Sequence, residues 1–171
     1  IRMSNNNVDK GKSLKEIIKH RLEKINNLRD FGIDPFPYNF NITSTVSELL
    51  KKNPPFDDTI YKTAGRVISF RKMGKVSFCH LLYEGLKIQV YIKSNLLKEG
   101  VYDKIVRNMD IGDIVGFEGI LFFTKTNELS IKSSDVVMLS KSIRPLPNIK
   151  EKDGETFFAF EDKELRYRNR H

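Results

Sequence analysis

Residues 71–93 read RKMGKVSFCHLLYEGLKIQVYIK and have the pattern of two short strands joined by a tight turn. Apolar and polar side chains alternate through residues 86–93, which is typical of a strand that buries one face. Glu84-Gly85 between the two halves predicts a two-residue hairpin turn. This pairing puts Phe78 and Gln89 on neighbouring strands, but alternation alone leaves open whether Phe78 faces the core or the solvent.

Strand-like segments on both sides of this hairpin indicate the fold. The predicted strands are residues 61–70, 75–82, 86–93, 113–123 and 128–139, with a helical or turn-rich stretch at residues 96–108 between the third and the fourth. Five short strands in this order, with a helical element after the third, are the arrangement of an OB-fold. The fold class is therefore predicted as mainly β, a five-stranded Greek-key barrel.

The chain before the barrel is predicted to be an amphipathic helix followed by a linker. Ser13 and Glu16 fit a capping box, and Gly32 fits a helix stop. The apolar stripe of this helix consists of Leu14, Ile17, Ile18, Leu22, Ile25 and Leu28. The predicted segments are a disordered lead-in (1–12), the helix and a proline-containing linker (13–58), the barrel (59–142) and a linker (143–171). The start of a helix at residues 164–171 suggests that a longer protein continues beyond this chain.

Composition narrows the class of partner. The formal net charge is +8 with an isoelectric point near 9.5, which favours nucleic acid over an anionic membrane. Much of the positive charge lies on or beside the N-terminal helix, whose polar face either follows a phosphate backbone or is simply solvated. One Cys and three scattered His predict no disulfide and no metal site. No apolar segment long enough for a membrane helix and no secretory signal are present, so a cytoplasmic location without membrane contact is expected.

The hairpin also carries the residues of a candidate binding face. OB-folds bind single strands through basic grooves and stacked aromatic rings. If Phe78 faces outward, its ring can stack on a base and the Gln89 amide can pair with a base edge. Arg71 can then hold a phosphate or a base. Flanking contacts with RNA are expected from four further residues, namely Arg66, Lys75, His80 and Tyr91.

Several stretches together resemble class II lysyl-tRNA synthetases. They are GRVISFRKMGKVSF (65–78), KIQVYI (87–92), EGVYDKIVRNMDIGDIVGFEGILFFTKTNELSI (99–131), RPLP (144–147) and ELRYRNRH (164–171). In that family this region is an N-terminal anticodon-binding OB-fold that leads into the catalytic domain. The resemblance implies that Phe78 faces outward and stacks on the central uracil of the lysine tRNA anticodon. It also implies that Gln89 and Arg71 read the edge of that base, and that Glu128 contacts a neighbouring one.

The same resemblance implies what lies outside this chain. The parent enzyme would use ATP and Mg²⁺ to attach lysine to tRNA and would act as a homodimer, whereas the present chain would have no catalytic residue and no cofactor of its own. Two departures from the family pattern are Asn127, where Gly is common, and the ending RYRNRH in place of RYRQRY. Alternatives are the matching domain of an aspartyl- or asparaginyl-tRNA synthetase, and an OB-fold module that binds other proteins.

Overall fold

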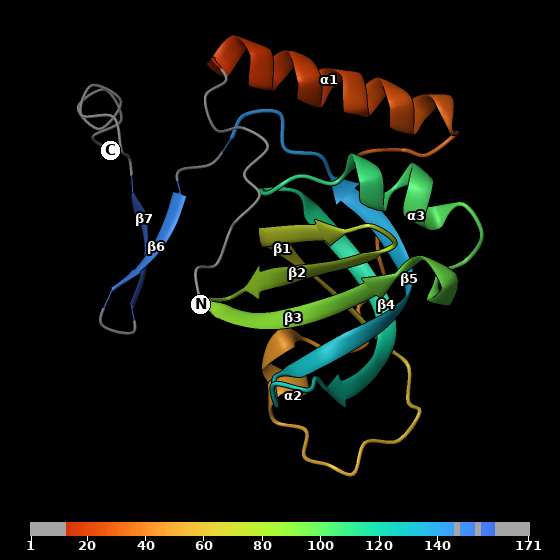
Figure 1. Cartoon of the computed structure of the whole chain (residues 1–171), viewed down its shortest axis with the longest axis vertical. Coiled ribbons are helices and arrows are strands. Elements are labelled where there is room, and N and C mark those ends of the chain that lie inside the picture. Colours follow the sequence, from red (N-terminus) through yellow and green to blue (C-terminus); the bar gives the residue numbers. More distant parts are fainter. Residues whose placement is uncertain (1–12, 146–147, 153–154, 160–171) are drawn as a thin grey trace.

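The structure is a computed structural model that describes residues 13–145, 148–152 and 155–159. Its centre is a closed barrel of five strands in the order β1-β2-β3-β5-β4 (Figure 1), which confirms the predicted OB-fold. The barrel strands are β1 (Tyr61–Met73), β2 (Val76–Tyr83), β3 (Leu86–Lys93), β4 (Ile114–Phe123) and β5 (Leu129–Ser140). The remaining elements are α1 (Leu14–Asp30), α2 (Val46–Leu50), η1 (Ser94–Leu96), α3 (Val101–Lys104), η2 (Val106–Asn108), β6 (Asn148–Lys152) and β7 (Glu155–Ala159).

The β2–β3 hairpin forms as its sequence predicts. Glu84 and Gly85 both adopt positive φ, 49° and 78°, which is the turn geometry that suits the twist of two paired strands. The inward face of β3 consists of Ile88, Val90 and Ile92, all buried. Leu86 shares their parity but is 41% exposed, because it lies beside the turn where the strand leaves the core.

The barrel closes where β3 and β5 run parallel, through Gln89, Val90 and Tyr91 opposite Ser130, Ile131 and Lys132. Elsewhere every neighbouring pair is antiparallel. Strands β4 and β5 approach closely at Gly119, where an added Cβ would lie 2.2 Å from the carbonyl oxygen of Lys132. Only glycine fits there, because the obstacle is backbone and cannot rotate away. The helical segment between β3 and β4 is three short pieces, η1, α3 and η2, in place of one continuous helix.

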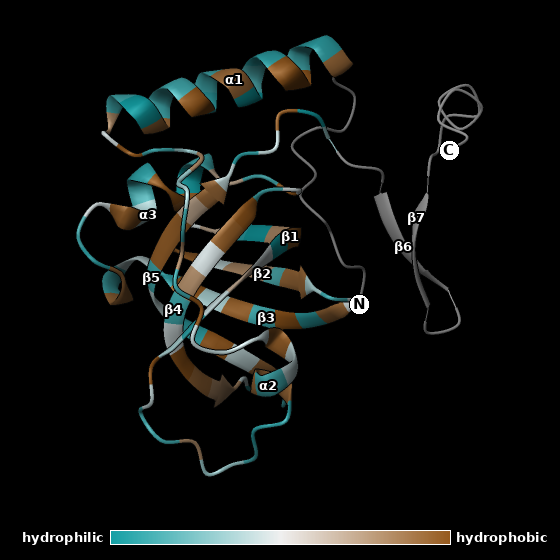
Figure 2. Ribbon diagram, turned by 180° about the vertical axis from the view of Figure 1, so that it is seen from behind, coloured by the Kyte–Doolittle hydropathy of each residue, from teal (hydrophilic) through white to brown (hydrophobic). Residues whose placement is uncertain are grey.

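Helix α1 lies across one end of the barrel and α2 lies at the other (Figure 1). Ser13 and Glu16 form the predicted capping box, and Gly32 ends the helix with a φ of 72°. The buried face differs from the predicted stripe, because it contains Arg21 and Lys24 together with Ile17, Ile25 and Leu28. Leu14 and Leu22 are instead 50% and 43% exposed. Apolar and polar segments alternate along the helix (Figure 2).

Arg21 and Lys24 are buried because they bind the barrel. The guanidinium of Arg21 donates to the carbonyl oxygens of Ser142 and Ile111, at 3.1 and 3.2 Å. The ammonium of Lys24 lies 2.5 Å from a carboxylate oxygen of Asp110. These two cations therefore dock the helix, and only the remaining basic residues of α1 are available to a polyanion.

The tail beyond the barrel contains a separate two-stranded antiparallel sheet of β6 and β7. This segment was predicted to be a linker, and no strand was predicted in it. The expected lead-in at residues 1–12 and the expected helix start at residues 164–171 lie outside the described residues. Within the part of the chain that is described, no helix is both long and apolar enough to cross a membrane.

Cys79 is fully buried on the inward face of β2. Burial raises the pKa of its thiol, and only the thiolate reacts readily with electrophiles. We expect a chromogenic disulfide reagent at pH 8 to leave the folded protein essentially unlabelled and to label one thiol per chain after unfolding in guanidinium. Rapid labelling of the native protein would contradict the inward orientation of this strand face.

Candidate nucleic-acid interface

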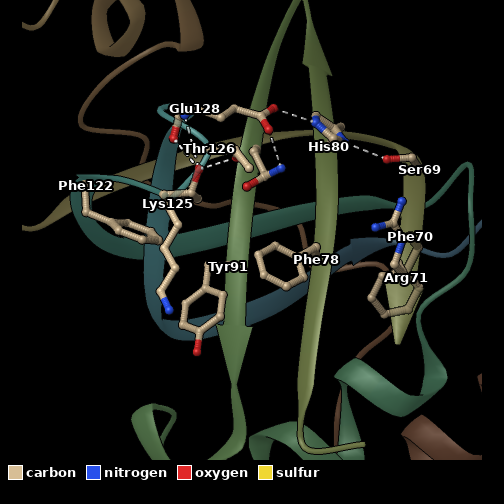
Figure 3. Close-up of a pocket in the computed structure, with 12 residues that line it drawn as sticks. Ser69, Phe70, Arg71, Phe78, His80, Tyr91, Phe122, Lys125, Thr126 and Glu128 are labelled. Atoms are coloured by element: carbon tan, nitrogen blue, oxygen red, sulfur yellow. Dashed lines mark hydrogen bonds and ion pairs between the residues drawn. The ribbon is translucent and has the colours of Figure 1, made fainter. Parts of the chain in front are cut away.

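A cavity of about 600 Å³ lies on the outward face of β1, β2 and β3, beside the β4–β5 turn (Figure 3). It is lined by all four residues predicted for base recognition, Arg71, Phe78, Gln89 and Glu128. His80 and Tyr91, predicted to flank them, line it as well. The remaining lining residues are Ser69, Phe70, Phe122, Thr124, Lys125 and Thr126.

Strand register brings these side chains together. Arg71 on β1 lies opposite Phe78 on β2, and Phe78 lies opposite Tyr91 on β3. On β2, Ser77 and Cys79 are buried in the core, so Phe78 between them points outward. The orientation that alternation left open is therefore settled, and it agrees with the resemblance. The functional role of Phe78 stays a prediction.

Three aromatic rings form a row across the cavity. The ring centroids of Phe78 and Tyr91 are 5.2 Å apart with planes inclined by 54°, and those of Tyr91 and Phe122 are 5.8 Å apart at 64°. Tilted contacts of this kind hold rings by their edges and leave faces on which a base can stack. Phe122 was not predicted. The alternation in β4 could have identified it, because buried Phe117 and Leu121 set the inward parity and place Phe122 outward.

A chain of hydrogen bonds crosses the upper part of the cavity (Figure 3). The Ser69 hydroxyl lies 2.7 Å from Nδ1 of His80, and Nε2 of His80 lies 3.0 Å from Oε1 of Glu128. The Gln89 amide donates to Oε2 of Glu128 at 2.8 Å and accepts from the Ser130 hydroxyl at 2.9 Å. Both the carboxylate and the amide are thus oriented before any ligand arrives.

The β4–β5 turn fixes the backbone that carries Glu128. Asn127 adopts a left-handed φ of 58°, which asparagine tolerates better than most residues. Thr124 closes the turn, since its amide donates to the Glu128 carbonyl at 3.0 Å and its hydroxyl accepts from the Glu128 amide at 3.1 Å. Asn127 therefore adopts the turn geometry at a position where Gly is common in the family that the sequence resembles. The same turn places Lys125 and Thr126 in the lining of the cavity.

Arg66 and Lys75 do not line this cavity. Arg66 donates to the carbonyl oxygen of Gly112 at 2.9 Å and lines a different groove, beside Phe40. Lys75 is exposed in the β1–β2 turn. Among the described residues, no group of three or more His, Cys, Asp or Glu side chains could hold a metal ion. The cavity therefore offers stacking faces, a guanidinium, an amide and a carboxylate, which are groups for noncovalent recognition of a base.

Comparison with known proteins agrees with this geometry. Residues 61–139 match the family of tRNA anticodon-type domains described as "OB-fold nucleic acid binding domain". The chain is 38% identical over 155 residues to a lysine–tRNA ligase of Fusobacterium nucleatum subsp. nucleatum, covering 91% of this chain and 30% of that protein. It is 40% identical over 158 residues to a lysine–tRNA ligase of Azobacteroides pseudotrichonymphae, covering 88% of this chain and 32% of that protein.

The chain thus spans about a third of the length of these curated relatives. The family match covers the whole of the barrel apart from the last residue of β5, and the similarity to the relatives extends over the helix and linker as well. The barrel therefore belongs to the tRNA anti-codon family of OB-fold nucleic acid binding domains, and the chain as a whole is similar to part of two lysine–tRNA ligases.

Proposed function

We propose that the cavity binds the anticodon of a lysine tRNA, with its central uracil stacked on Phe78. Arg71 and Gln89 read the edge of that uracil, and Glu128 contacts a neighbouring anticodon base. The observation that supports this most strongly is the convergence of a ring face, an amide, a guanidinium and a carboxylate on one cavity. Folding of the barrel core does not require these four groups to lie together on the outer face, so their convergence favours a role in binding.

The chemistry of the side chains suits an unpaired pyrimidine. Uracil presents two carbonyl acceptors on either side of one N–H donor. Gln89 uses one amide proton on Glu128 and keeps a second for a carbonyl, while exposed Arg71 supplies further donors. A stacked base is worth roughly 1–3 kcal/mol, and the polar groups then select among bases.

The rest of the activity is proposed for the whole protein. We propose that it is a lysine–tRNA ligase that uses ATP and Mg²⁺ in a catalytic domain outside this chain, acts as a homodimer and works in the cytoplasm. The basis is the similarity to relatives of which this chain covers about a third. A single buried thiol without a disulfide partner is compatible with a reducing compartment.

A binding panel tests the proposal. The 171-residue chain is titrated with anticodon stem-loops of lysine type and with loops changed at one anticodon position. We expect the lysine loop to bind best and a change of the central uracil to cost the most affinity. Preference for an aspartate or asparagine loop over the lysine loop would assign the domain to a related synthetase. Equal binding of all loops would overturn anticodon recognition and favour a protein-binding module.

Helix α1 is expected to add affinity without selectivity. Lys15 and Lys19 lie on its exposed face, whereas Lys24 is committed to Asp110. Changing both exposed lysines to Gln should weaken binding of every stem-loop and lower the salt slope by roughly 0.7–0.9 for each phosphate that these lysines neutralise. Titrations at two salt concentrations measure this. An unchanged slope would mean that the exposed face is only solvated.

A further inference from the structure

We infer that His80 is a positioning residue, which together with Ser69 holds the Glu128 carboxylate in the orientation that discriminates between bases. This inference rests on the proposed function and deepens it. His80 was expected to touch RNA directly, but its ring nitrogens are directed at two protein groups, Ser69 on β1 and Glu128 at the β4–β5 turn (Figure 3). His80 therefore links two elements that are distant in the sequence.

The hydrogen-bond partners fix the tautomer of the ring. The ionised carboxylate of Glu128 only accepts, so Nε2 of His80 carries the proton at the 3.0 Å contact. In a neutral ring, Nδ1 then accepts from the Ser69 hydroxyl at 2.7 Å. A hydroxyl both donates and accepts, so Ser69 retains its bond when the ring is protonated. The hydrogen bond from His80 to Glu128 is therefore present whether the ring is neutral or protonated. It orients the carboxylate in both states and does not respond to pH.

Stability does not explain this arrangement. The side chains of His80 and Glu128 are 29% and 45% exposed, and ion pairs in contact with water contribute little to folding. The Glu128 backbone is already fixed by Thr124, so its position in the turn needs no further anchor. His80 binds Oε1 of Glu128 and Gln89 binds Oε2, so together they restrict the rotation of the Glu128 side chain.

Restricting that rotation has a consequence for recognition. A free glutamate loses much rotational freedom when a ligand orders it, and a side chain ordered in advance avoids that loss on binding. Each carboxylate oxygen retains a lone pair after accepting one bond. A fixed carboxylate accepts a base N–H and rejects a base that presents an acceptor there, whereas a mobile carboxylate can turn aside. His80 should therefore affect selectivity more than affinity.

The test combines NMR of the free protein with stem-loop binding. His80→Phe keeps a ring but removes the donor, and Ser69→Ala removes the partner behind it. His20→Gln is the matched control, because His20 also faces a glutamate, Glu23 at 3.6 Å on exposed α1, away from the cavity. Each change is measured alone and in a Glu128→Gln background, with the lysine stem-loop and loops altered at one anticodon position.

We expect His80→Phe to reduce the discrimination at one anticodon position by about tenfold, the size of one hydrogen bond to a charged group. Affinity for the lysine loop should fall less, His20→Gln should change neither, and His80→Gln, which keeps a donor, should restore part of the discrimination. In the Glu128→Gln background His80→Phe should have no further effect on selectivity. Unchanged discrimination, or additive effects of the two substitutions, would overturn the inference.

The histidine nitrogen shifts of the free chain separate this inference from the proposed function. We expect neutral His80 to carry its proton on Nε2, assigned by loss of the signal in His80→Phe. A proton on Nδ1 would show that His80 does not donate to Glu128, and it would refute the positioning role of His80 even if the chain binds RNA. Conversely, an Nε2 proton in a chain that binds no stem-loop would leave the hydrogen bond intact but refute both the proposed function and the selectivity role that depends on it.

Discussion

Replacing Phe78 by Ala is expected to weaken binding of a lysine-type anticodon stem-loop by about 1–3 kcal/mol, or about 5- to 150-fold. The ring of Phe78 lies between Arg71 and Tyr91 in the strand register and touches Tyr91 through a tilted contact at 5.2 Å. It is partly exposed at the cavity and points away from the core. Alanine therefore removes the stacking face and leaves the interior of the barrel unchanged.

Two further variants identify the cause of the loss. Phe78→Leu keeps much of the apolar volume but has no aromatic face, and it should lose nearly as much affinity as alanine. Phe36→Ala removes a ring that is 40% exposed and does not line the cavity, and it should bind as the unchanged protein does. Circular dichroism and thermal unfolding verify that each variant is folded. Wild-type affinity in Phe78→Ala would refute stacking at this position.

Much of the barrel could be predicted from local pattern. Period-two alternation and turn residues located all five strands, and β3 was predicted at its observed bounds. The turn at Glu84-Gly85 followed from residue chemistry. Strand β1 runs three residues beyond its predicted end, because the polar residues Arg71 and Lys72 pair with β2 while facing solvent.

The docking of α1 could not be predicted in the same way. An amphipathic pattern assigns apolar residues to the buried face, so Leu22 was included and Arg21 and Lys24 were not. Burying a cation is favourable only where a specific partner exists. The partner of Lys24 is Asp110, 86 residues away in the sequence, and no local pattern reveals it.

The binding site was predicted in part, for a similar reason. Hairpin pairing put Phe78 near Gln89, but the strand orientation needed the family resemblance. Ser69 was missed because it reaches the cavity through its pairing with His80 on β2. Alternation in β4 turns Phe122 outward, but only the pairing of β4 with β5 brings it to the cavity. Arg66 was grouped with Arg71 by charge, yet it lies five residues away along β1, where it pairs with Leu82 and donates to the carbonyl oxygen of Gly112.

The largest effect on stability is expected at Lys141. Its ammonium is fully buried and lies 2.6 Å from Asp110 and 2.9 Å from Asp113, whose own side chain is also fully buried. Burial opposes the charge of both carboxylates. At Asp110 the nearby Lys141 and Lys24 ammonium groups outweigh it and lower the pKa to about 2. At Asp113 burial prevails and raises the pKa, so Asp113 depends on Lys141 for its charge compensation.

Lys141→Met should reduce the free energy of unfolding by about 3–5 kcal/mol at pH 7, because it leaves a buried carboxylate without its cation. The amides of Asp110 and Ser142 would still donate to Asp113, but neither carries a positive charge. Lys98→Gln is the matched control. It removes an ion pair with Asp135 whose lysine side chain is 68% exposed, and it should cost less than about 1 kcal/mol. Urea unfolding measures both.

The dependence on pH identifies Asp113 as the source of the loss. A carboxyl group whose pKa is higher in the folded than in the unfolded protein binds its proton more tightly when folded, so protonation stabilises the fold. The pKa of Asp113 is already raised above its ordinary value of 3.8, and losing Lys141 should raise it further. The loss of unfolding free energy in Lys141→Met should therefore become smaller as the pH falls from 8 toward 3.8, the ordinary pKa of an aspartate. A deficit that is constant over this range would instead indicate lost packing, and Asp113→Asn combined with Lys141→Met should then recover no stability.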